Sequence, residues 1–138
     1  MKNIILAFDG SEYSNRALQY AKTFTERFEA TLWLVHIFTH TSDLLGYEDY
    51  EKLYSKRKAS GQTLLGEAFQ ELSNTKLDVR EKLEEGPEAE SILNIAKKCQ
   101  ADLILMGTRG HGTLKGLLVG SVSRKVIHHS ACPVMVVH

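Results

Sequence analysis

The sequence predicts an α/β domain in which helices on both faces wrap a parallel sheet of five strands. Five short apolar runs alternate with helical patterns along the 138 residues, and this alternation is typical of such a sheet. The runs extend over Lys2 to Phe8, Leu32 to Phe38, Leu77 to Leu83, Asp102 to Met106 and Pro133 to Val137. With 43% hydrophobic residues, the chain can bury one core without disulfides or metals. We therefore expect a single domain over residues 1–138.

The pattern within each run indicates its place in the sheet. The first, second and fourth runs are apolar at nearly every position, as expected of strands buried on both faces. Leu77 to Leu83 alternates with charged residues, which predicts an edge strand. Ser11 or Ser14 can cap the first helix, and Gly86-Pro87 opens the third. The apolar faces consist of Ala17, Leu18, Ala21, Phe24 and Phe28, and of Ile92, Leu93, Ala96 and Cys99.

Charge and cysteine content restrict the classes of partner. Seventeen basic and seventeen acidic residues cancel, so no overall field attracts nucleic acid or an anionic membrane, and any anion site must be local. The apolar stretch at the amino end is too short for an export signal or a membrane span, so we expect a cytoplasmic protein. Cys99 and Cys132 are then expected to be reduced. Neither lies in a metal-binding spacing, and His36 and His40 fall in a strand and a loop rather than on one helix face.

A glycine-rich loop between the fourth strand and the last helix predicts an anion site. Gly107-Thr108-Arg109-Gly110 follows the strand directly, and Gly120-Ser121 precedes the helical pattern of Val122 and Val126. Free amides and the positive end of the helix dipole meet at such a helix start, where they favour phosphate. The alternative is that the glycines Gly112, Gly116 and Gly120 only permit close packing or a turn.

Asp9 ends the first strand, and ligands bind at the carboxyl ends of parallel strands where connections diverge. If the first and fourth strands are neighbours, Asp9 and Gly107 face each other across that crevice. The carboxylate can accept hydrogen bonds from sugar hydroxyls; alternatively, it caps the first helix.

The sequence lacks the motifs of several other proteins that bind nucleotides or phosphate. There is no GxxxxGK[ST] motif, and Asp9-Gly10-Ser11-Glu12 replaces the GxGxxG that an NAD enzyme needs after its first strand. A phosphoaspartate receiver is not indicated either. It requires further acidic residues and a lysine at the end of the fifth strand, and this sequence lacks them. Slow ATP hydrolysis or phosphoryl transfer stays open, although His111 is the only titratable candidate near the phosphates. No catalytic residue and no protein metal site are therefore assigned.

These segments resemble the universal stress protein family, specifically its nucleotide-binding branch. The likeness covers essentially the whole chain, and the glycine spacing is its most specific part. The matching segments are Ile4 to Ser11 with Ser14 and Ala17-Leu18, then Leu34 to Ile37, Ala101 to Gly107 and Cys132 to Val137. Ala7 and Phe8 depart from the residues that many members have there. The resemblance implies strand order 3-2-1-4-5 and regulation through a bound adenine nucleotide, with an unknown protein partner.

The resemblance also assigns residues to parts of the nucleotide. It implies that main-chain groups near Ala7 and Ile37 hold adenine, and that Asp9 and Gly107 hold ribose. The phosphates of ATP, ADP or AMP would be held by Thr108, Arg109, Gly110, Gly120, Ser121, Val122 and Ser123. Glycine lets the backbone approach phosphate, the hydroxyls of Ser121 and Ser123 can donate to it, and the Arg109 charge can offset it. Mg²⁺ is expected with a triphosphate, held mainly by phosphates and water.

The family implies a homodimer in which the fifth strands pair. The sequence supports this independently, because Val134 to Val137 is an uninterrupted apolar strand. An open edge of that kind favours aggregation unless a second copy covers it.

Overall fold

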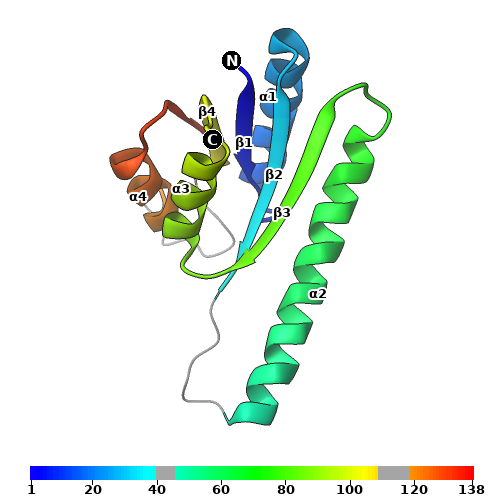
Figure 1. The fold of residues 1–138 in the computed structure, drawn as a ribbon, viewed down its shortest axis with the longest axis vertical. Helices are drawn as coiled ribbons and strands as arrows, with labels where there is room; N and C mark the ends of the chain where they lie inside the picture. The colour runs from blue at the N-terminus through cyan, green and yellow to red at the C-terminus, as the bar shows by residue number, and fades with distance from the viewer. Residues whose placement is uncertain (40–45, 109–118) are drawn as a thin grey trace.

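The computed structural model describes residues 1–39, 46–108 and 119–138. The elements are β1 (Asn3–Ala7), α1 (Glu12–Phe28), β2 (Thr31–Phe38), α2 (Tyr47–Leu72), β3 (Asp78–Glu85), α3 (Glu88–Lys98), β4 (Leu103–Gly107), α4 (Ser121–His129) and β5 (Val134–Val137). The strands form one parallel sheet in the order β3-β2-β1-β4-β5 (Figure 1). This confirms the predicted fold class, the strand order and the edge position of the third strand.

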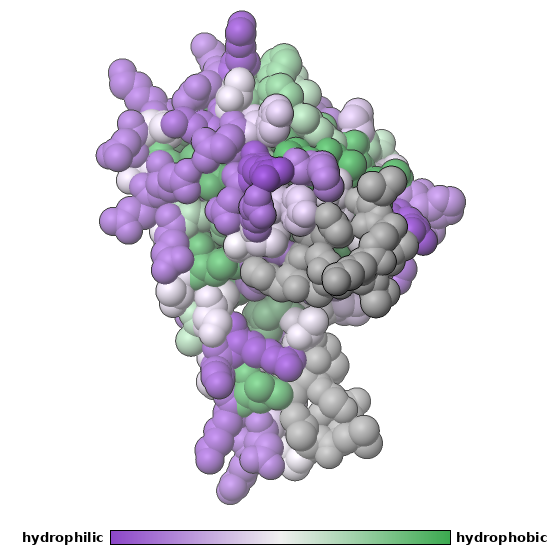
Figure 2. All heavy atoms as spheres, turned by 180° about the vertical axis from the view of Figure 1, so that it is seen from behind, coloured by the Kyte–Doolittle hydropathy of each residue, from purple (hydrophilic) through white to green (hydrophobic). Residues whose placement is uncertain are grey.

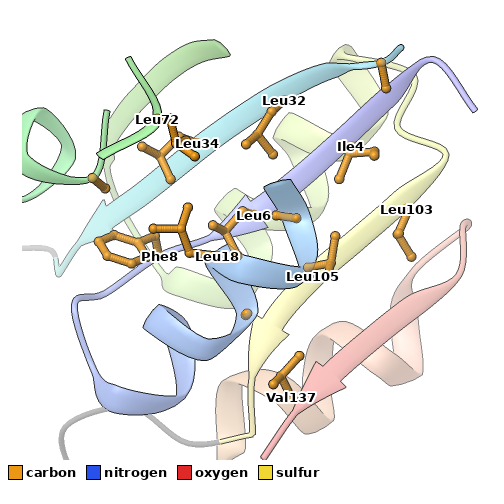
Figure 3. Packing of buried hydrophobic residues seen from close by; sticks show 14 of the residues in the cluster. Ile4, Leu6, Phe8, Leu18, Leu32, Leu34, Leu72, Leu103, Leu105 and Val137 are labelled. Carbon is orange, nitrogen blue, oxygen red and sulfur yellow. The ribbon is translucent and has the colours of Figure 1, made fainter. Parts of the chain in front are cut away.

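The central strands are buried because helices cover both faces of the sheet. Successive strand residues point to opposite faces, so Leu6 packs beneath α1 and α2, whereas Ile5 packs beneath α3 and α4. Figure 3 shows the first of these two clusters, with Leu18 of α1 and Leu72 of α2 above the strands. Leu6 and Ile5 are both 0% exposed, and burying each side chain contributes about 1.5–3 kcal/mol.

The turn from β1 into α1 uses one of the two serines that the sequence offers as caps. Ser11 is the N-cap, and its hydroxyl accepts the N–H of Ser14 at 3.2 Å. Gly10 before it has a φ of 76°, a left-handed conformation that glycine adopts without strain. One residue of the predicted helix face is wrong: Phe28 is 49% exposed, because it is the last helical residue, where the chain turns back towards β2. Thr25 is buried on that face instead.

Helix α2 is the longest element, with 26 residues. Its carboxyl-terminal half packs on the sheet through Leu65, Ala68 and Leu72, which are nearly inaccessible to solvent. Its amino-terminal half extends past the carboxyl ends of the strands (Figure 1). Seen from the opposite side, this part is a narrow, mostly hydrophilic projection (Figure 2). Among the described helices, none combines the length and apolar content that a membrane span requires.

Candidate functional site

A cavity of about 770 Å³ lies at the carboxyl ends of the strands. This volume is within the range of about 300–1,000 Å³ that small-molecule sites occupy. Its walls come from the ends of β1, β2 and β4, from one face of α2, and from the first turns of α3 and α4. It therefore lies where the connections from β1 and β4 leave the sheet in opposite directions, as expected for a ligand site in this topology.

Most of the predicted site residues line this cavity. They are Ala7, Asp9, Ile37, Gly107, Gly120, Ser121, Val122 and Ser123. Thr108 does not line the cavity, and Arg109 and Gly110 lie outside the described residues, as do the alternative glycines Gly112 and Gly116 and the candidate base His111. Segments far apart in sequence thus meet at one place.

Asp9 is held in place by the turn that it forms. Its Oδ1 accepts the N–H of Ser11 at 2.9 Å, which is the geometry of an Asx turn. Ser11, rather than Asp9, provides the helix cap. Because an ionised carboxylate can accept several hydrogen bonds, Asp9 can stabilise the turn and still bind a hydroxyl group in the cavity.

The first turn of α4 presents main-chain donors to the cavity. The N-cap is Gly120, which has no side chain to cap the helix, and its own N–H donates to the carbonyl of Thr108 at 2.6 Å. The first bond within the helix runs from the N–H of Arg124 to Gly120 at 3.0 Å. The N–H groups of Ser121, Val122 and Ser123 precede it and have no acceptor within the helix. Donors of this kind, together with the helix dipole, favour a bound anion.

Two predicted phosphate ligands use their side chains to hold the fold together. The Ser123 hydroxyl is buried and donates to the carbonyl of Gly107 at 2.9 Å. The Thr108 hydroxyl is also buried and lies 3.4 Å from Nδ1 of His138. In this arrangement the Ser123 proton is directed at a carbonyl and not at the cavity, because a serine hydroxyl has one proton to donate. Ser123 can therefore contribute its main-chain N–H, whereas the exposed Ser121 can contribute both groups.

Sequence reasoning missed the wall that α2 contributes. Lys56, Arg57, Ser60 and Gly61 line the cavity, and the Arg57 Nη1 donates to the carbonyl and the hydroxyl of Thr39, both at 3.1 Å. The basic run Lys56-Arg57-Lys58 is visible in the sequence. The pattern alone does not indicate that the helix extends over the strand ends, so this run looks like a solvated helix face.

Glu88 was also missed. It is half-buried at the start of α3 and lines the cavity. Burial, and secondarily the negative charge of Asp9, raise the pKa of its carboxyl group, while His36 acts in the opposite direction. The Nδ1 of His36 lies 2.8 Å from the carbonyl oxygen of Phe8, which positions the ring. The ionisation of Glu88 is therefore disfavoured by burial and by the carboxyl group of Asp9, with which it shares the cavity.

The raised pKa of Glu88 predicts a pH-dependent effect of Glu88→Gln. A carboxyl whose pKa is raised in the folded state stabilises the fold below its unfolded pKa of about 4.3, and this contribution disappears as pH rises through the raised value. We expect the Gln variant to match the wild type at low pH and to be the more stable protein at neutral pH. Urea unfolding across a pH series measures the difference.

Glu90 on the same helix provides a control of opposite sign. Its carboxylate pairs with Lys125, which lowers its pKa, so any stability it contributes is present above its unfolded pKa and is lost as pH falls. Glu90→Gln should leave the protein unchanged or less stable at neutral pH. Equal behaviour of the two variants would contradict the assigned environment of Glu88.

Comparison with known proteins gives one consistent family. The family model described as "Universal stress protein family" matches residues 1–138. The "Universal stress protein in QAH/OAS sulfhydrylase 3'region" of Thermus aquaticus is 37% identical over 136 residues, covering 99% of this chain and 98% of that protein. Among solved structures, hypothetical protein MJ0577 has a TM-score of 0.90 at 29% identity, covering 99% of this chain and 94% of that one.

A further solved structure is a universal stress protein in complex with cAMP. Its TM-score is 0.76 at 26% identity, and the match covers 99% of this chain and 97% of that one. The matches to the family model and to the Thermus aquaticus protein extend over nearly the whole sequence. The chain therefore belongs to the universal stress protein family.

Proposed function

We propose that this protein binds an adenine nucleotide in the cavity at the strand ends and acts as a regulatory module in a stress response. The observation that carries this proposal is the meeting of Asp9, Gly107 and the first turn of α4 around one cavity. A carboxylate that accepts from hydroxyls therefore lies across from a cluster of amide donors that favour phosphate. The relative solved with cAMP supports an adenine nucleotide as the ligand class.

In the proposed pose, adenine lies against the main chain near Ala7 and Ile37. Ribose lies between Asp9 and Gly107, and the phosphates extend to Thr108, Arg109, Gly110 and the amides of residues 120–123. ATP, ADP and AMP share these contacts, and Mg²⁺ would accompany the triphosphate through its phosphates and water. The free thiols of Cys99 and Cys132 support a cytoplasmic location.

The direct test is titration calorimetry with AMP, ADP and ATP, the last with and without Mg²⁺. We expect saturable binding of at least one of them, and no response to adenine-free ribose 5-phosphate at the same concentrations. Phosphate release from ATP distinguishes binding from turnover. A rate near background supports a regulatory module, whereas sustained release would establish the ATPase alternative. Absence of binding by all three nucleotides would refute the proposal.

We also propose that the protein forms a homodimer through β5. This strand lies at the sheet edge opposite β3, and Val134, Met135 and Val136 are only partly buried. Ile127 of helix α4 is also exposed, at 46%, and α4 contacts β5. An uncovered apolar edge strand favours pairing with a second copy.

Val136→Asp should convert the dimer into monomers, because a charge would then lie within the paired strands. Analytical ultracentrifugation measures the change, and circular dichroism verifies that the variant is folded. Val136→Thr keeps the branched shape and strand preference of valine, so this control should remain dimeric. A Val136→Asp protein that is folded and still dimeric would refute this interface.

A further inference from the structure

The residues that line the cavity come from both faces of the sheet, and the part of the cavity on each face is here called a lobe. Ala7, Val35 and Ile37 point to the face that α3 and α4 cover. Phe8 points to the other face, where it packs with α1 and α2. All four residues line the same cavity, so the cavity continues around the ends of β1 and β2 from one face of the sheet to the other. The proposed nucleotide pose accounts for the lobe on the α3 and α4 face.

The second lobe, here called the α2 lobe, is the part lined by Phe8, His36 and Phe38 together with the face of α2 from Leu53 to Leu64. Two contacts place the strand side chains beneath α2. The Phe38 ring meets the Tyr54 ring edge to face, with 5.6 Å between centroids. A Cβ added at Gly61 would lie 3.0 Å from the ring of His36.

The face of α2 that borders this lobe carries charge where a core-facing helix is normally apolar. Its cavity-lining residues are Leu53, Lys56, Arg57, Ser60, Gly61 and Leu64, spaced three and four apart as on one helical face. Leucines stand at the two ends of this face. Two cations and a hydroxyl occupy its middle, so the break in the apolar pattern coincides with the cavity.

Within residues 1–39, 46–108 and 119–138, neither cation is paired with a carboxylate. Lys56 has no ion pair or hydrogen bond there, and Arg57 donates only to the neutral oxygens of Thr39. The carboxyl groups of Asp9 and Glu88 also line the cavity, and Glu88 belongs to α3 on the opposite face of the sheet. Charge is therefore distributed unevenly, and an anionic group in the shared space is attracted towards α2 and away from Glu88.

We propose that the α2 lobe is a second anion subsite, in which Lys56, Arg57 and Ser60 bind a phosphate or carboxylate group beside the base of the bound nucleotide. Arginine and serine supply hydrogen-bond donors to such a group, and lysine supplies charge. The position beside the base rests on the proposed function, whereas the subsite itself rests on the α2 face. The group can come from a separate small anion or from a substituent on the base.

Two titrations distinguish these sources. In the first, inorganic phosphate is added at constant ionic strength to ¹⁵N-labelled protein saturated with AMP, and the Gly61 amide and Arg57 Nε–Hε resonances are followed. In the second, calorimetry compares AMP with adenylosuccinate, an AMP that carries a dicarboxylate on the base. Each is repeated with Lys56→Gln and with the control Lys58→Gln. The control removes the same charge from a lysine that lies over the Tyr54 ring and does not line the cavity.

We expect saturable shifts with phosphate, or tighter binding of adenylosuccinate than of AMP, and Lys56→Gln should weaken that interaction about fivefold. The affinity of Lys56→Gln for AMP should stay within about twofold of the wild-type value. Lys58→Gln should stay within about twofold of the wild type in both titrations. If AMP binds normally while neither titration depends on Lys56, the subsite is refuted and the proposed function stands. If AMP does not bind but ADP or ATP does, the phosphate titration is repeated with that nucleotide; if none of the three binds, the proposed function fails. Phosphate is then titrated into the ligand-free protein. The subsite is supported if the shifts are saturable and weaker in Lys56→Gln, and it is refuted if they do not depend on Lys56.

Discussion

Gly107→Ala should destabilise the fold by about 3 kcal/mol, because the added methyl group has no space. A Cβ at this position would lie 2.7 Å from the Cβ of Tyr13 and 2.9 Å from the backbone nitrogen of Ser14. These atoms belong to the first turn of α1, which lies against the end of β4. Backbone cannot rotate away as the tip of a side chain can, so either the helix or the strand must shift. Urea unfolding measures the loss.

Gly66→Ala is the matched control for this prediction. Gly66 lies within α2, and a Cβ there would meet nothing within 4 Å. Alanine has the higher helix propensity, so this variant should be more stable than the wild type by about 0.5–1 kcal/mol. A Gly107→Ala protein as stable as the wild type would show that Gly107 is not required for packing. Its role would then be limited to giving the ligand access to the backbone.

Ser121→Pro should weaken nucleotide binding about tenfold to a hundredfold while leaving the fold intact. The N–H of Ser121 is one of the donors at the start of α4, and a hydrogen bond to a charged group contributes about 1.5–3 kcal/mol. Proline removes this N–H and is well tolerated at the first position of a helix. Gly120 before it already has φ −70° and ψ 168°, the extended conformation that a residue preceding proline favours.

Ser121→Ala separates the amide from the hydroxyl. Alanine keeps the N–H and removes only the side-chain oxygen, so it should lose less affinity than proline if main-chain donors hold the phosphates. Calorimetry with ATP or AMP gives both values, and thermal unfolding of the ligand-free variants verifies the fold. Equal losses for the two variants would assign the contact to the hydroxyl instead, and no loss with proline would contradict phosphate binding at this helix start.

The predictions that succeeded depend on local patterns. Leu103 to Met106 is apolar at every position, which predicts a buried strand. The strand is buried because helices cover both of its faces. Leu77 to Leu83 is predicted to be an edge strand because its charges need solvent on one side, and β3 (Asp78–Glu85) lies at the sheet edge. Ser11 caps α1 because a hydroxyl at that position reaches an amide three residues later. Each of these features is determined by neighbours in the sequence, and so it is visible without the structure.

The parts of the candidate site that escaped prediction depend on distant contacts. The hydroxyl of Ser123 has a partner at Gly107, and no sequence pattern indicates which acceptor a serine will choose. Glu88 lies near Asp9 only because α3 begins beside the end of β1. Lys56 and Arg57 reach the cavity because α2 extends past the sheet (Figure 1). Tertiary packing decides all three placements.

The hydrogen bond from the N–H of Gly120 to the carbonyl of Thr108 fixes the two anchors of the intervening stretch within the fold. Lengthening a stretch between fixed anchors costs little, about 0.6 kcal/mol for each doubling of its length. Duplicated genes of this architecture could therefore exchange or extend that stretch and acquire different ligand preferences without redesigning the sheet. For the same reason, a protein engineer could graft foreign peptides between these anchors.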